Sequence, residues 1–100
     1  MQPFILTIDI GTSSTRALLF DAAAQRVPGV LAQLPNRPQV SSAGDVTFDL
    51  DELEQTLVAV LDLALQQASA QAIEIAAVAT SSFATTIVGV DDDGAAVTPV

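Results

Sequence analysis

Residues 6–21, LTIDIGTSSTRALLFD, decide most of what this chain's sequence predicts. An apolar run ends at Asp9, a polar turn begins at Gly11, and a second apolar run follows Arg16. Two apolar runs that flank a short glycine-containing turn predict a β-hairpin. Backbone N–H groups, hydroxyls and a guanidinium at such a turn can bind phosphate, and the carboxylate can help hold a hydrated Mg²⁺. The stretch therefore predicts a phosphate-binding turn.

Composition indicates one small folded domain that has more apolar surface than its own core can bury. The chain has 100 residues, of which 50% are hydrophobic and 15% charged, so disorder is not expected. A chain of this length buries roughly 60–65% of its unfolded surface. We expect part of the remaining apolar surface to face another chain or a missing part of a larger protein, and the isolated chain to self-associate.

Charge limits the classes of binding partner, and cysteine content bears on the cellular compartment. Three basic against twelve acidic residues give a net charge of −9, which argues against nucleic acid or an anionic membrane as partner. A nucleotide site on so acidic a chain would depend on a metal ion. No run approaches the roughly 20 apolar residues of a membrane span. The lack of cysteine is compatible with the cytoplasm.

The first half of the chain reads as three strands and a helix. Strands are predicted at Phe4–Ile10, at 16–21 and, as an edge strand or with a bulge, at 27–34, with surface loops at 35–38 and 41–45. Asp49 followed by Glu52 predicts a helix start. One helical stripe collects the apolar side chains at spacings of three and four: Leu50, Leu53, Leu57, Val60, Leu61, Ala64, Leu65 and Ala68.

The second half predicts a buried strand and a hairpin. Residues 73–80 read as the buried strand, and residues 86–90 and 95–100 as strands joined by a turn at 91–94. Three adjacent aspartates from Asp91 suggest calcium, but they lack the alternating ligands of an EF-hand, which favours a turn. The predicted class is α/β, in the order β-β-β-α-β plus a hairpin. The last strand of that core can return beside the first by a right-handed crossover.

The string D-x-G-T-S-S-x-R, from Asp9 to Arg16, resembles the first phosphate loop of the sugar kinase, actin and heat-shock ATPase superfamily, and most closely the FGGY family of carbohydrate kinases. Residues 79–94, ATSSFATTIVGVDDDG, with Pro99 after them, resemble a second segment of that family in the correct order. The resemblance implies a ribonuclease H-like (actin-like ATPase) fold. Residues 1–100 would be the incomplete N-terminal part of the first kinase lobe, without the second lobe.

The same resemblance assigns roles to particular residues. Asp9 would orient Mg²⁺ through water, and the ATP phosphates would be bound by Gly11, Thr12, Ser13 and Arg16. Phe83 and Ala84 would line the sugar side. The parent protein would transfer the γ-phosphoryl group of Mg-ATP to a sugar or polyol in the cytoplasm. The general-base aspartate would lie outside this chain, so the isolated chain should be inactive.

Substrate identity does not follow from these residues. The family places arginine, glutamate or histidine after the strand that ends near residue 80, and residues 82–86 contain none of them. Since unpaired sugar hydroxyls in a buried site cost binding energy, the pocket is altered, takes its polar partners from elsewhere, or prefers a less hydrated ligand. In general character the sequence is nearest to gluconate or xylulose kinases.

Three other classes of function remain open at this point. A non-sugar ATPase of the same superfamily would account for the first loop, and a non-catalytic binding fragment would use the fold alone. A dimeric aspartic protease would use Asp9 as half of its catalytic pair. Ile10 stands where that family has a hydroxyl residue, and the amphipathic helix has no place in a small all-β protease.

Overall fold

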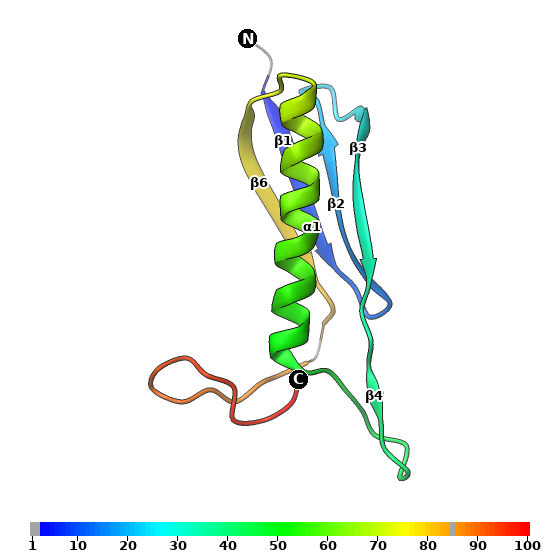
Figure 1. Cartoon of the computed structure of the whole chain (residues 1–100), viewed down its shortest axis with the longest axis vertical. Helices are drawn as coiled ribbons and strands as arrows, with labels where there is room; N and C mark the ends of the chain where they lie inside the picture. Colours follow the sequence, from blue (N-terminus) through cyan, green and yellow to red (C-terminus); the bar gives the residue numbers. More distant parts are fainter. Residues whose placement is uncertain (1–2, 85) are drawn as a thin grey trace.

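The computed structural model describes residues 3–84 and 86–100. Its main element is a four-stranded sheet in the order β3-β2-β1-β6, with one helix, α1, laid along one face (Figure 1). The elements are β1 (Phe4–Ile10), β2 (Ser14–Phe20), β3 (Arg26–Pro35), α1 (Leu50–Ala70) and β6 (Ile75–Ser82). A separate two-stranded ribbon joins β4 (Gln39–Val40) to β5 (Val46–Thr47).

The first three strands form an antiparallel meander, and β6 adds to it in parallel with β1. This arrangement confirms the α/β class, the strand order and the return of the last core strand beside the first. The predicted bounds of β1 are those observed, whereas β2 begins two residues earlier than predicted, at Ser14. The edge position predicted for the third strand is confirmed.

Helix α1 begins where the sequence predicts. The Asp49 carboxylate accepts a hydrogen bond from the Glu52 N–H at 3.1 Å, so Asp49 is the N-cap. The helix packs on β2 and β3, and the shared core contains Leu6, Ala17, Leu19, Val30, Ala32, Val60, Ala64 and Ala68. One residue of the predicted stripe, Leu65, is 49% exposed, because its side chain does not lie on the helix face that contacts the sheet.

Strand β6 corrects one prediction. Residues 73–80 were expected to form a buried strand, but β6 runs over Ile75–Ser82 and most of its side chains are exposed. Val78 pairs in register with buried Leu6, yet it is 55% exposed because α1 covers β2 and β3 instead. The apolar pattern of β6 is thus typical of a buried strand, but no element among the described residues packs over most of its side chains.

The C-terminal segment corrects another prediction. Neither residues 86–90 nor residues 95–100 form a strand, and the pairing of the two arms is reduced to one bridge between Val90 and Ala96. The Gly89 N–H is taken by the Thr98 hydroxyl at 2.7 Å, which replaces a regular ladder bond with a side-chain bond. The turn at 91–94 is confirmed, since Gly94 N–H donates to the Asp91 carbonyl.

Candidate functional site

The predicted site residues of the first loop lie at one end of the sheet, where β1 and β6 both end. Ligands of open α/β sheets commonly bind outside the carboxyl ends of parallel strands, and β1 and β6 are the parallel pair here. Asp9 is opposite Arg16 on β2 and opposite Ser81 on β6. Because side chains alternate along a strand, these three side chains project from the face opposite α1.

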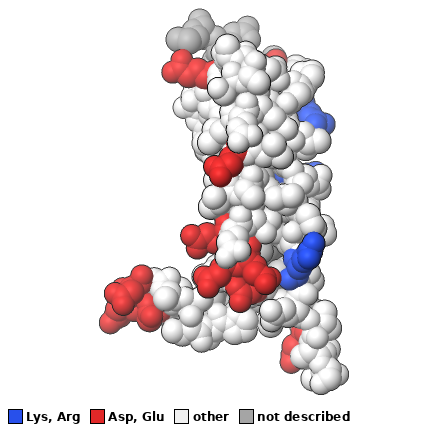
Figure 2. Space-filling view, in the orientation of Figure 1, with Lys and Arg blue, Asp and Glu red and all other residues white. Residues whose placement is uncertain are grey.

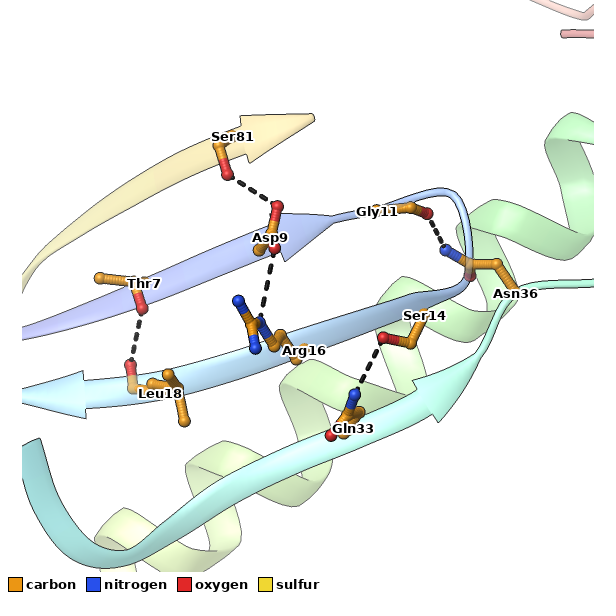
Figure 3. Close-up of polar contacts among 9 residues, drawn as sticks. All are labelled: Thr7, Asp9, Gly11, Ser14, Arg16, Leu18, Gln33, Asn36 and Ser81. Atoms are coloured by element: carbon orange, nitrogen blue, oxygen red, sulfur yellow. Dashed lines mark hydrogen bonds and ion pairs between the residues drawn. The ribbon is translucent and has the colours of Figure 1, made fainter. Parts of the chain in front are cut away.

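Asp9 is held from both sides. The Ser81 hydroxyl donates to its Oδ1 at 2.9 Å, and Arg16 Nε lies 3.4 Å from its Oδ2 (Figure 3). The side chains of Arg16 and Asp9 are 51% and 43% exposed, so both remain open to a ligand. Ser81 was not predicted as a site residue. Its place opposite Asp9 follows from strand register, which the sequence pattern alone does not give.

The contact through Nε leaves most of the Arg16 guanidinium available. A guanidinium carries five N–H donors, and the ion pair with Asp9 uses the one on Nε. The remaining donors belong to the two terminal nitrogens, which can bind an anion in a forked geometry. Arg16 can therefore stay next to Asp9 and still contact a phosphate group.

The turn between β1 and β2 is closed by its own backbone. The Gly11 N–H donates to the Ser14 carbonyl at 2.9 Å, and a Cβ at position 11 would lie 3.0 Å from that oxygen. The close approach, not a positive φ, is therefore what requires glycine here. The side chains of Thr12 and Ser13 are exposed, and nothing in residues 3–84 and 86–100 binds their hydroxyls.

Asn36 is a site residue that the sequence analysis missed. It was assigned to a surface loop because prolines flank it, but its side chain is 6% exposed and contacts the turn. Its Nδ2 donates to the Gly11 carbonyl at 2.6 Å (Figure 3). Its Oδ1 accepts from the Thr15 hydroxyl at 3.0 Å. A buried amide between two prolines leaves no pattern in the sequence that distinguishes it from a loop asparagine.

Phe83, one of the two predicted sugar-side residues, lies at the same end of the sheet but on the helix side. The Phe83 N–H donates to the Ile10 carbonyl at 2.9 Å, and the Phe83 ring stacks on Phe48 with centroids 5.3 Å apart. Phe83 lines a largely apolar hollow of about 390 Å³ together with Leu53 and Ile87. Ala84 follows it and is exposed, whereas Thr85 lies outside the described residues.

Acidic residues do not form a ready-made metal site. Within the described ranges, no three side chains of His, Cys, Asp or Glu converge to hold a metal ion. The Asp91 carboxylate accepts from the N–H groups of Asp93 and Ala95, as in a turn. Figure 2 shows acidic side chains gathered at the helix start, next to a basic side chain, and on the C-terminal loop. In the described part of the chain, no helix is long and apolar enough to cross a membrane.

The chain matches one protein-family model over nearly its whole length. Residues 4–100 match the N-terminal domain of the FGGY family of carbohydrate kinases. Among curated proteins, the glycerol kinase of Rhizobium meliloti (strain 1021) is 35% identical over 88 residues. That match covers 88% of this chain but 17% of the relative, so the chain spans about one sixth of the relative's length.

Solved structures agree on the fold. The xylulose kinase of Rhodospirillum rubrum superposes with a TM-score of 0.81 at 24% identity, over 96% of this chain and 19% of that one. The gluconate kinase of Lactobacillus acidophilus superposes with a TM-score of 0.78 at 22% identity, over 99% and 19%. At these identities the likeness shows the shared fold, that of the actin-like sugar kinases.

Proposed function

This chain belongs to the FGGY family of carbohydrate kinases, and we propose that it supplies the first phosphate loop and part of the sugar-side wall of an ATP-dependent sugar or polyol kinase. The observation that supports this most is the Asp9 arrangement. A carboxylate lies one residue before the end of β1, a hydroxyl-rich turn follows the strand, and an arginine on β2 lies beside the carboxylate on the open face of the sheet. The aspartic protease alternative does not fit, because α1 and the parallel strand β6 belong to an α/β fold.

Asp9 is proposed to face the metal that accompanies ATP. Mg²⁺ keeps several waters and is commonly held through one or two carboxylates plus substrate phosphates. Asp9 is half-exposed and belongs to no group of three His, Cys, Asp or Glu side chains among the described residues, which fits a water-mediated contact of this kind. When bound, the ion would neutralise phosphate charge as the phosphoryl group is transferred. Ser81 fixes one oxygen of Asp9, which limits the directions in which the carboxylate can accept.

The turn is proposed to bind phosphate oxygens through its free donors. The Gly11 N–H is used inside the turn, so Gly11 contributes shape rather than a donor. The unengaged hydroxyls of Thr12 and Ser13 and the terminal nitrogens of Arg16 are the groups that remain. Catalysis of phosphoryl transfer rests mainly on positioning and charge neutralisation, and these groups can supply both.

We propose that Phe83 and Ala84 line the sugar side of the site, and that the substrate is a sugar or a polyol. The hollow beside Phe83 is largely apolar, so the directional hydrogen bonds that a polyol needs would come from other parts of the kinase. The relatives act, by their names, on glycerol, xylulose or gluconate. Because the reaction consumes ATP, we propose the cytoplasm as its location.

The isolated 100-residue chain is proposed to be inactive and to self-associate along β6. The two edges of the sheet differ. At the β3 edge, the Gln67 amide binds both the N–H and the carbonyl of Leu31, at 2.9 and 3.1 Å, so these groups cannot pair with another strand. The β6 edge has exposed apolar side chains such as Val78 and lies at the end of the sheet. Unprotected edges of this kind pair with other chains.

The kinase proposal is tested by ADP formation in a full-length kinase that carries this segment. Glycerol, xylulose and gluconate are supplied in turn with Mg-ATP, and Asp9→Asn is compared with Asp62→Asn, which removes an exposed helix charge remote from the turn. We expect Asp9→Asn to lower kcat by about 100-fold or more, a typical loss for a group that stabilises transferring phosphate. Asp62→Asn should stay within about twofold. Full activity of Asp9→Asn, or no ADP with any sugar or polyol, would contradict the proposal.

A further inference from the structure

The phosphate turn, residues 11–15 of the β1–β2 hairpin, is clamped by one buried residue, Asn36, through its side chain and its backbone N–H, directly after the end of β3. Asn36 contacts three residues of the turn: its Nδ2 donates to the Gly11 carbonyl, its own N–H donates to the Ser13 carbonyl at 2.9 Å, and its Oδ1 accepts from Thr15. Thr15 is fully buried, and Asn36 nearly so. Each contact joins a different part of the turn to β3.

Asn36 binds two carbonyl groups that the turn's own hydrogen bond leaves unpaired. The internal hydrogen bond of the turn joins Gly11 to Ser14, and it leaves the carbonyls of Gly11 and Ser13 without a partner inside the turn. Asn36 binds both of these carbonyls, so the peptide planes 11–12 and 13–14, which lie on either side of the Thr12-Ser13 pair, are fixed. Those planes set the directions of the Thr12 and Ser13 side chains, whose hydroxyls are free for a ligand.

We propose that Asn36 is a positioning residue that holds the phosphate turn in the shape that binds ATP. This inference rests on the proposed function, since it assumes that the turn binds phosphate. Asn36 itself does not touch the ligand, because its amide is buried behind the turn and both of its polar atoms are engaged. It acts through the backbone of Gly11 and Ser13.

The chemistry of the clamp requires an amide. One end must donate to a carbonyl and the other must accept from a hydroxyl, and asparagine offers both on one short side chain. Asn36→Asp keeps the acceptor for Thr15 but sets a carboxylate oxygen against the Gly11 carbonyl. Asn36→Ala removes the two side-chain contacts, keeps the backbone contact with Ser13, and leaves buried polar groups unpaired, which is the costly case for a hydrogen bond.

The first test is steady-state kinetics in a full-length kinase that carries this segment. We expect Asn36→Ala and Asn36→Asp to lower kcat/KM for ATP by about 10- to 100-fold, as misplaced catalytic geometry does. The KM for the sugar should stay within about twofold, because the hydrogen bonds of Asn36 go to the turn and not to Phe83. The matched control is Gln67→Ala, which removes two amide contacts to the same strand, at Leu31, far from the turn. It should leave kcat/KM for ATP within about twofold.

The second readout does not depend on catalysis. Amide hydrogen exchange of the peptide covering residues 10–15 should become faster in Asn36→Ala and remain unchanged in Gln67→Ala. Thr15→Val and Thr15→Ser serve if Asn36→Ala fails to fold: the valine variant should lower kcat/KM for ATP and the serine variant should restore it, since serine keeps the hydroxyl. If the wild type is inactive but hydrogen exchange is faster in Asn36→Ala, the kinase proposal is refuted, while the proposal that Asn36 holds the turn is supported. A folded Asn36→Ala with unchanged exchange and kcat/KM within threefold of wild type would overturn the inference.

Discussion

Replacing Ala24 by glycine should stabilise this chain, because Ala24 has a backbone conformation that favours glycine. Ala24 has φ of 58°, in the left-handed region. It occupies the fourth position of a five-residue turn that starts at Asp21, whose Oδ1 accepts from the N–H groups of Ala23 and Gln25, both at 2.9 Å. The Ala24 N–H donates to the Asp21 carbonyl at 3.0 Å.

The chain contains the same turn with glycine in that position. Asp91 accepts from the residues two and four positions later at 2.9 Å, and Gly94, at the fourth position, has φ of 82°. A third copy starts at Ser41 and has Gly44 with φ of 90°. Two of the three turns therefore use glycine where the turn at Asp21 uses alanine.

The magnitude follows from two opposing terms. The left-handed conformation costs an ordinary L-residue about 1–2 kcal/mol, and glycine avoids that cost. Glycine loses more chain entropy on folding, by about 0.5–1 kcal/mol. The net gain in the free energy of unfolding for Ala24→Gly is about 0.5–1 kcal/mol. At a urea slope of about 1 kcal/mol per molar, the midpoint should rise by about 0.5–1 M.

The assay is urea unfolding followed by circular dichroism at low protein concentration. Ala23→Gly is the matched control, because Ala23 lies in the same turn without a positive φ and should lose about 0.5–1 kcal/mol. The reasoning would be refuted by a midpoint for Ala24→Gly at or below that of the wild type, or by equal shifts in the two variants.

Two further predictions concern the turn and the sheet edge. Gly11→Ala sets a Cβ 3.0 Å from the Ser14 carbonyl oxygen and should break the hydrogen bond of the turn. We expect the free energy of unfolding in urea to fall by about 0.5–1.5 kcal/mol, and kcat/KM for ATP in a full-length kinase to fall as well. Unchanged values would show that the turn accommodates the methyl group without loss of stability. Val78→Lys should weaken self-association of the isolated chain about tenfold or more in light scattering, because a charge on an edge strand opposes pairing, whereas Val58→Lys on the helix should not; equal effects would place the interface elsewhere.

Local chemistry explains what could be predicted from the sequence. The bounds of β1, the Asp49 cap and the turn at Asp91 depend on neighbouring residues in the chain, which the sequence displays directly. The grouping of Asp9, Gly11 and Arg16 follows from one hairpin, so a two-residue error in the start of β2 did not disturb it.

The features that escaped prediction depend on residues far apart. Ser81 reaches Asp9 from 72 positions away, and Asn36 reaches Gly11 from 25 positions away through the length of β3. The exposure of β6 depends on which strands α1 covers, and no periodicity within β6 encodes this. Residues 86–90 have strand-like composition, but a side-chain bond from Thr98 takes the place of the regular pairing.

The position of α1 over β2 and β3 also has a consequence for the order of folding during synthesis. The elements that this packing joins all lie between residues 14 and 70, so they leave the ribosome before β6 does. Hairpins form in about 1–10 μs, whereas a chain grows by about 5–20 residues per second. The meander and its helix therefore have time to assemble first. Strand β6 then meets a β1 edge that is already in place, and its parallel pairing becomes the addition of a strand to a template.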